Sequence, residues 1–331
     1  MKNFTYFRPK TAEDAVGLLD DKWGTTELLA GGTDLLDLQK EYIAQPEKVI
    51  SLSGIKGLGG IETEGERVVI QAGAKLAEIA EHVELRKLFP ALTSAAQDIG
   101  GPQIRNMGTL GGNLCQRNRC WYFRDEPTVC LLKGGERCFA LDGENRYHAI
   151  FRDGHKCVIV NPSTLAPVLA ALGAEVATLA PGGGRKLPMD QFYQAPSSAT
   201  EREHVLKPNE MVVSVSIPKT GTRNASYLVF HKQAYDWPLV QAAVAFALED
   251  GKASKVRVML GHVAPTPRIA EEAARALEGK EVSDETATAA GKAAAEGAKP
   301  LAQNGYKVKL VEVAVKRAIL TAAGQKRYWE T

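Results

Sequence analysis

The residues best suited to redox or metal chemistry are the five cysteines of the chain. All of them lie between residues 115 and 157, a stretch without a sustained helix or strand period: Cys115, Cys120, Cys130, Cys138 and Cys157. Four thiolates can hold a zinc ion or a cubane iron–sulfur cluster, but no C-x-x-C pair occurs, so the spacing does not choose a metal. Buried, unreactive cysteine is the alternative interpretation, and the odd number argues against a disulfide framework. His148 and His155 are further possible ligands nearby.

Two glycine-rich segments have the composition of cofactor-binding turns. The first, LLAGGTDLL over 28–36, follows a short apolar strand, and the second, IRNMGTLGGNL over 104–114, offers the Thr109 hydroxyl and the Asn113 amide. Glycine lets the backbone approach a ligand closely, and N–H groups at the start of a helix point at an anion, so a pyrophosphate fits the first segment. Ordinary tight turns are the alternative. The sequence has neither a Rossmann fingerprint nor a Walker A motif. Two separate glycine-rich segments favour two lobes that bind one elongated ligand between them.

The elements that must position these segments alternate between helix and strand in the first two thirds of the chain. Thr11 with Asp14 predicts a helix start. Expected strands lie at 28–30, 48–52, 67–71 and 175–179, and expected helices at 33–40, 77–85, 91–98 and 162–172. The long irregular stretch around the cysteines is typical of an ordered, functional loop.

The last third of the chain has a different pattern. It predicts an antiparallel meander of strands with Asp250-Gly251 as a hairpin turn, followed by helices at 269–277, 284–297 and 308–322. We therefore place a domain boundary near residue 220. The first domain is 1–220, with lobes of about 1–55 and 56–220 and the cysteine loop at 115–160, and the second is 221–331.

Composition excludes several classes of protein. The 331 residues carry 41 Lys+Arg against 39 Asp+Glu and are 44% hydrophobic, as in an ordinary globular protein. This composition excludes a disordered chain, a collagen and a coiled coil. The nearly balanced charge also gives no sign of the positive surface that binds nucleic acid. No apolar run of about 18 residues and no export signal is visible, so we expect neither membrane nor nucleic-acid partners. The expected compartment is the cytoplasm, with the periplasm as the alternative if a signal-bearing partner carries the chain across.

Taken in order, LLAGGTDLL, IRNMGTLGGNL and GHVAPTPR over 261–268 resemble the FAD-binding medium subunit of molybdenum hydroxylases, the xanthine dehydrogenase and carbon monoxide dehydrogenase family. The resemblance implies an α+β fold: a two-lobed FAD-binding domain of the vanillyl-alcohol-oxidase type, followed by a C-terminal antiparallel sheet with helices. Thr164 stands in a segment where the family usually has an aspartate, so that position offers a hydrogen bond but no charge. The FAD-binding residues that the resemblance implies are Leu28, Leu29, Ala30, Gly31, Gly32, Thr33, Asp34, Leu35, Leu36, Ile104, Gly108, Thr109, Gly111, Gly112, Asn113, Thr164, Val212 and Lys232.

The sequence of the cysteine loop resembles that of one subgroup of this family. NLCQRNRCWYFRDEPTVC and GERCFALDGENRYHAIF are similar to the flavin subunits of periplasmic aldehyde oxidoreductases and 4-hydroxybenzoyl-CoA reductase, which carry an additional [4Fe-4S] cluster. The ligands that this resemblance implies are Cys120, Cys130, Cys138 and Cys157. Cys115 is then left over and is expected to pack near the flavin.

The function implied is that of an electron-transfer subunit in a heterotrimeric molybdoenzyme. An aldehyde, an aromatic heterocycle or a CoA thioester would react in a molybdopterin-binding large subunit. Electrons would pass through a small subunit with two [2Fe-2S] clusters to the FAD, and ferredoxin or another one-electron carrier would exchange them. No catalytic acid or base is expected of this chain. A stand-alone flavin oxidase and a structural zinc module are the alternatives.

Overall fold

The first lobe is a small parallel sheet. The structure is a computed structural model that describes residues 1–232 and 235–325. The sheet has the order β1-β3-β2, with strands β1 (Thr5–Phe7), β2 (Thr26–Leu29) and β3 (Lys48–Ser51). Helices α1 (Ala12–Gly17) and α2 (Leu35–Lys40) make the crossovers that parallel strands need. The predicted start of α1 is confirmed, because the Thr11 hydroxyl accepts a hydrogen bond from the Asp14 amide at 3.0 Å.

The second lobe is built on a larger antiparallel sheet. Its order is β4-β5-β8-β6-β7, with strands β4 (Ile61–Glu64), β5 (Arg67–Gln71), β6 (Glu175–Leu179), β7 (Lys186–Pro188) and β8 (Met211–Pro218). The helices of this lobe are α3 (Leu76–Glu81), α4 (Val83–Leu88), α5 (Pro90–Gln97), α6 (Pro102–Met107), α7 (Leu110–Cys115) and α9 (Leu165–Ala171), with a 3-10 turn η2 (Met189–Gln191). Every residue of α9 is buried. One apolar core runs through both lobes and includes Ile50, Ile70 and Leu169.

The predicted single helix over 77–85 is wrong, because the chain breaks at His82. This residue has φ −67° and ψ 120°, an extended conformation that ends α3 and begins α4. Its Nδ1 accepts a hydrogen bond from the Leu85 amide at 3.3 Å and so caps the second helix. The apolar spacing continues across the break, which is why the sequence does not reveal it.

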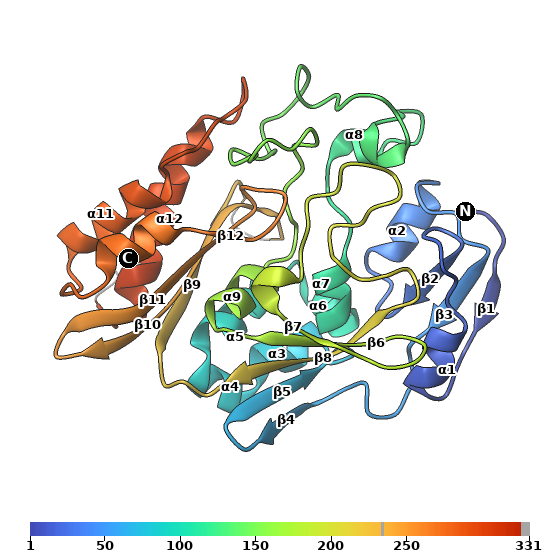
Figure 1. The fold of residues 1–331 in the computed structure, drawn as a ribbon, viewed down its shortest axis with the longest axis horizontal. Coiled ribbons are helices and arrows are strands. Elements are labelled where there is room, and N and C mark those ends of the chain that lie inside the picture. Colours follow the sequence, from blue (N-terminus) through green and yellow to red (C-terminus); the bar gives the residue numbers. More distant parts are fainter. Residues whose placement is uncertain (233–234, 326–331) are drawn as a thin grey trace.

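The cysteine loop spans the top of the molecule in Figure 1, between the first lobe in blue and the C-terminal sheet in orange. Its regular structure between residues 116 and 164 consists of α8 (Trp121–Arg124) and the 3-10 turn η1 (Leu131–Lys133). The loop nevertheless packs around a small apolar core, which includes Phe123, Leu132 and Ile159 and which it shares with Leu38 of α2. Its backbone also bonds to the C-terminal part, as where the Ile150 amide donates to the Val263 carbonyl at 2.9 Å.

The C-terminal part is an antiparallel sheet with helices on both faces. The sheet has the order β12-β11-β10-β9, with strands β9 (Arg223–Phe230), β10 (Pro238–Glu249), β11 (Lys252–Gly261) and β12 (Arg268–Ile269). The last helices are α10 (Glu271–Leu277), α11 (Asp284–Ala294) and α12 (Tyr306–Ala322). They cover one face, while α5 and α9 cover the other (Figure 1). The predicted turn at Asp250-Gly251 is confirmed, and both residues have the positive φ that a tight hairpin needs.

Within residues 1–232 and 235–325, no helix combines the length and apolar character that crossing a bilayer requires.

Candidate functional site

Three neighbouring cavities lie between the two lobes. The largest, about 540 Å³, is lined by the first glycine segment and by Thr109, Gly112 and Val212 from the second lobe. A cavity of about 350 Å³ shares Ala30, Thr109 and Gly112 with it. A third, of about 430 Å³, shares Thr33, Asp34 and Thr109. Shared walls of this kind suit one elongated ligand that touches both lobes.

The glycine at position 31 allows the two glycine segments to meet. A Cβ atom added to Gly31 would lie 1.9 Å from the Met107 carbonyl oxygen, which is backbone and has little freedom to move. Across this contact the second segment is held by Thr109, whose hydroxyl accepts a hydrogen bond from the Gly112 amide at 3.1 Å. The sequence therefore needs glycine here for close approach of two backbones, as well as for any approach of a ligand.

Most of the predicted FAD-binding residues line these three cavities. They are Leu28, Ala30, Gly31, Gly32, Thr33, Asp34, Leu35, Ile104, Gly108, Thr109, Gly111, Gly112, Asn113, Thr164 and Val212. Leu29 and Leu36 are not among the lining residues, although their neighbours are. Lys232 lies elsewhere, in the wall of a separate cavity beside the cysteine loop.

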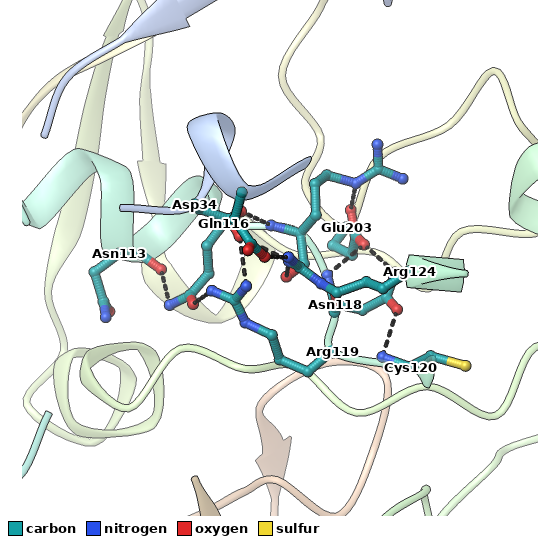
Figure 2. A network of polar contacts seen from close by, with 10 residues as sticks. Asp34, Asn113, Gln116, Asn118, Arg119, Cys120, Arg124 and Glu203 are labelled. Atoms are coloured by element: carbon teal, nitrogen blue, oxygen red, sulfur yellow. Dashed lines mark hydrogen bonds and ion pairs between the residues drawn. The ribbon is translucent and has the colours of Figure 1, made fainter. Parts of the chain in front are cut away.

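The Asp34 carboxylate ties the first glycine segment to the cysteine loop (Figure 2). One oxygen accepts from Arg119 Nη1 at 2.5 Å and from Arg124 Nη2 at 2.7 Å. The other accepts from the backbone amide of Arg117 at 2.9 Å. Burial alone would raise the pKa of Asp34, but the Arg119 and Arg124 guanidiniums hold it below its ordinary value. Asp34 was predicted in the cofactor wall, and the structure shows its charge engaged by the loop.

Glu203 anchors the same loop from the opposite side. Its buried carboxylate accepts from Arg117 Nε at 2.8 Å and from both the amide and the side chain of Asn118, at 3.1 and 2.8 Å. The Asn118 side-chain oxygen in turn accepts from the Cys120 amide at 3.1 Å, which fixes the backbone of that cysteine (Figure 2). The residues of this network that the sequence did not predict are Arg117, Asn118, Arg119, Arg124 and Glu203. The available signal was three arginines within eight residues of the cysteine loop.

Two guanidiniums, each paired with a carboxylate, line the largest cavity. Arg117 Nη2 is buried without a hydrogen-bond partner among the described residues. Arg202 lies 3.6 Å from Glu27, and burial lowers the pKa of Arg202 to about 10. Both arginines line the cavity together with the Gly31–Gly32 turn. The buried Arg117 Nη2, in the cavity that the Gly31–Gly32 turn also lines, matches the acceptor oxygens of a phosphate.

Four of the five cysteines lie within electrostatic reach of one another. A hydrogen bond with Cys157 lowers the pKa of the Cys138 thiol to about 6, and burial, assisted by the charges of Cys138 and Cys130, raises that of Cys120 to about 12. His148 Nε2 lies 3.2 Å from Cys120 Sγ. Cys115 is separate: it lines the largest cavity, and burial raises its pKa to about 12.

These thiols do not form a closed ligand set. Within the described part of the chain, no three His, Cys, Asp or Glu side chains converge in the manner of a metal site. The [4Fe-4S] ligands therefore stay a prediction.

Asp34→Asn is expected to destabilise the chain by about 2–4 kcal/mol, because it removes the partly buried carboxylate that Arg119 and Arg124 share, while Arg124 keeps its contact with the exposed Asp37. The free energy of unfolding in urea measures this. Asp37→Asn is the matched control: its carboxylate is 57% exposed and contacts Arg124 at 2.8 Å, so we expect a loss below about 1 kcal/mol. An equal loss of unfolding free energy in the two variants would mean that the contacts of Asp34 do not stabilise the fold.

The stabilisation by Glu203 is expected to depend on pH. Burial alone would raise the pKa of Glu203, but Arg117 and the hydrogen bonds from Asn118 hold it below its ordinary value. Since the folded pKa is the lower one, the stabilisation is complete above the ordinary glutamate pKa of about 4.3 and is lost as pH falls through the folded pKa. The gap in unfolding free energy between wild type and Glu203→Gln should therefore narrow as pH falls in that window. Urea melts at several pH values test this, and a gap that stays constant would contradict it.

The fold and its inter-lobe cavities define a two-lobed flavin-binding class of protein with a C-terminal sheet domain. The sequence matches the FAD binding domain in molybdopterin dehydrogenase over residues 2–220 and the CO dehydrogenase flavoprotein C-terminal domain over residues 225–322. The chain therefore belongs to the family of FAD-binding medium subunits of molybdenum hydroxylases, and the α+β fold predicted from the sequence is confirmed.

Two relatives and one solved structure illustrate the similarity. The chain is 33% identical to the aldehyde oxidoreductase FAD-binding subunit PaoB of Escherichia coli (strain K12), over 98% of this chain and 100% of that protein. It is 29% identical to the carbon monoxide dehydrogenase medium chain of Hydrogenophaga pseudoflava, over 96% of each. The solved structure of carbon monoxide dehydrogenase from Hydrogenophaga pseudoflava superposes with a TM-score of 0.77 at 28% identity, over 97% of this chain and 98% of that one.

Proposed function

We propose that the chain is the FAD and [4Fe-4S] electron-transfer subunit of a heterotrimeric molybdopterin hydroxylase or dehydrogenase. A large subunit would hold the molybdopterin and transform an aldehyde, an aromatic heterocycle or a CoA thioester. A small subunit with two [2Fe-2S] clusters would connect it to this chain, and ferredoxin or another one-electron carrier would exchange electrons with it. When bound, FAD supplies the change between two-electron and one-electron transfer.

The inter-lobe cavities support the FAD assignment. The Gly31–Met107 contact brings backbone from both glycine segments to one wall, and Arg117 Nη2 lacks a partner in that wall. A pyrophosphate has acceptor oxygens for both kinds of donor. Leu28–Leu36 and Thr109–Asn113 would enclose the middle of the cofactor, with Ile104, Gly108, Thr164 and Val212 around them. The Thr164 carbonyl accepts from Gln241 Nε2 at 2.9 Å, and its hydroxyl would be available to the ligand.

The cysteine loop supports the cluster assignment. Cys120, Cys130, Cys138 and Cys157 are the donors a cubane takes, and the Cys138–Cys157 hydrogen bond brings two sulfurs together. Asn118 fixes the backbone at Cys120, so one ligand is held by the network that also holds Asp34. This shared network is the observation that carries the proposal, because it links the wall of the flavin cavity at Asp34 to the cysteine loop at Cys120. Lys232 lines the separate cavity beside the cysteine loop, and we keep it as a proposed further cofactor contact.

The family also favours a subunit over the two alternatives. The relatives matched over their full length are named as a FAD-binding subunit and as a medium chain, which are components of larger enzymes. A stand-alone oxidase would need a substrate pocket with its own base, and a zinc module would leave the inter-lobe cavities unexplained.

Isolation of the native complex tests the assignment of partners. The chain, tagged at one end and purified anaerobically from its own host, is expected to carry with it molybdenum and the electron paramagnetic resonance signals of two [2Fe-2S] clusters. A chain that purifies alone, and whose reduced flavin is turned over by oxygen with a substrate of its own, would contradict the proposal.

A further inference from the structure

A fourth cavity lies between the cysteine loop and the C-terminal sheet. It has a volume of about 350 Å³ and shares Arg119, Asp236, Trp237 and Pro238 with the third inter-lobe cavity. Its outer rim carries Trp121 and Trp237, which are 47% and 44% exposed, and its interior carries His148, His262 and Lys307, which are buried. Neither the flavin nor the cluster assignment uses these interior groups.

The interior has hydrogen-bonding capacity that the described residues do not satisfy. Lys307 Nζ donates to the Tyr147 and His262 carbonyls, both at 2.9 Å, and an ammonium has a third N–H. His262 Nε2 and His148 Nδ1 are buried without a hydrogen-bond partner. Buried polar atoms left unpaired are costly, so these two ring nitrogens, together with the third N–H of Lys307, suit a ligand that offers acceptor oxygens.

The charge in this cavity favours an anion. Burial lowers the pKa of Lys307 to about 7, and burial with the nearby Lys307 charge lowers that of His262 to about 3, so the imidazole is neutral. The Arg119 charge is already paired with Asp34. Among the described residues that line the cavity, the one carboxylate is that of Asp236, which accepts from the backbone amides of Lys232 and Trp237 at 3.0 and 2.9 Å. A carboxylate beside Lys307 would hold the lysine in its charged form.

The rim of the cavity favours a planar ring. Trp121 and Tyr147 are stacked with their ring centroids 5.6 Å apart and an interplanar angle of 17°. Arg119 covers the Trp237 ring at 4.5 Å and so holds the opposite rim. Exposed aromatic faces at the mouth of a cavity with polar groups at its base are the arrangement that binds small amphipathic molecules.

We propose that this cavity binds a planar aromatic carboxylate, with its ring between Trp121 and Trp237 and its carboxylate at Lys307 Nζ and His262 Nε2. A carboxylate is the oxidation product of an aldehyde. If the enzyme oxidises aromatic aldehydes, which rests on the proposed function, the product would bind beside Cys120 on the subunit through which the electrons leave.

Calorimetric titration of the FAD-loaded full chain with benzoate tests the site. We expect saturable binding at one site, and binding of benzyl alcohol, which lacks the charge, at least about tenfold weaker. Lys307→Met should weaken benzoate binding by about tenfold or more. Trp121→Ala, at an exposed position that leaves the fold intact, should weaken it by about threefold or more. Tyr6→Ala removes an equally exposed ring on β1 and should leave it unchanged.

Several outcomes would overturn the inference. One is equal binding of benzoate and benzyl alcohol, or no binding of either. Another is unchanged affinity in Trp121→Ala and Lys307→Met, and a third is release of FAD by benzoate, which would place the ligand in the inter-lobe cavities. Iron and flavin are measured in the same samples, so that the benzoate site and the electron-transfer assignment are tested separately. A chain that lacks FAD and iron but still binds benzoate through Lys307 would refute the electron-transfer assignment and would support the benzoate site.

Discussion

Gly31→Ala is expected to weaken FAD binding by about tenfold to a hundredfold. The added Cβ would lie 1.9 Å from the Met107 carbonyl oxygen, so the two glycine segments must move apart. Forced repacking of this kind costs about 1–3 kcal/mol, and each 1.4 kcal/mol is a factor of ten in affinity. The fluorescence of released flavin during dialysis of the purified chain measures the effect.

Gly17→Ala is the matched control for this variant. A Cβ at Gly17 meets no atom within 4 Å, and the residue does not have a positive φ. This substitution should leave FAD affinity unchanged. If Gly31→Ala retained flavin as well as Gly17→Ala does, the contact between the two glycine segments would not be what shapes the cofactor cavity.

Cys120→Ser is expected to lose most of the iron of the anaerobically purified chain while retaining FAD. Serine is a poor substitute for thiolate in a cubane, and the remaining thiols cannot supply a fourth sulfur from the loop. FAD should stay, because Cys120 itself lines none of the three inter-lobe cavities. Iron and flavin per chain, measured on one sample, give both results.

Cys115→Ser is the matched control, because it removes a thiol that lines the flavin cavity and lies apart from the other four. Iron should be unchanged in this variant. Iron lost from Cys115→Ser and retained in Cys120→Ser would mean that the ligand set has been assigned to the wrong cysteines.

The local features of this fold could be predicted from the sequence because their causes are local. The Thr11 cap, the strand before Gly31 and the turn at Asp250-Gly251 each depend on a few adjacent residues. The break at His82 could not, since the apolar period runs through it. The start of the predicted helix at 269 also differs, because Arg268–Ile269 pairs with β11 as β12 before α10 begins at Glu271.

The sequence predicts which segments form the site, but it does not predict the contacts that join these segments. The glycine segments and cysteines are visible as composition, but Asp34 meets Arg117, Arg119 and Arg124 only after the chain has folded back. Glu203 reaches Asn118 from a further segment that has no motif of its own. Pairings between residues this far apart are set by tertiary packing, which no single-sequence pattern records.

Whether this one chain carries both a flavin and an iron–sulfur cluster can be measured directly. The chain is purified anaerobically, and FAD, iron, acid-labile sulfide and zinc per chain are measured together with its visible spectrum. We expect one FAD with about four irons and about four sulfides, and a broad thiolate-to-iron band near 400 nm beneath the flavin bands. FAD without iron would rule out the cluster, and zinc without FAD would contradict both cofactor assignments.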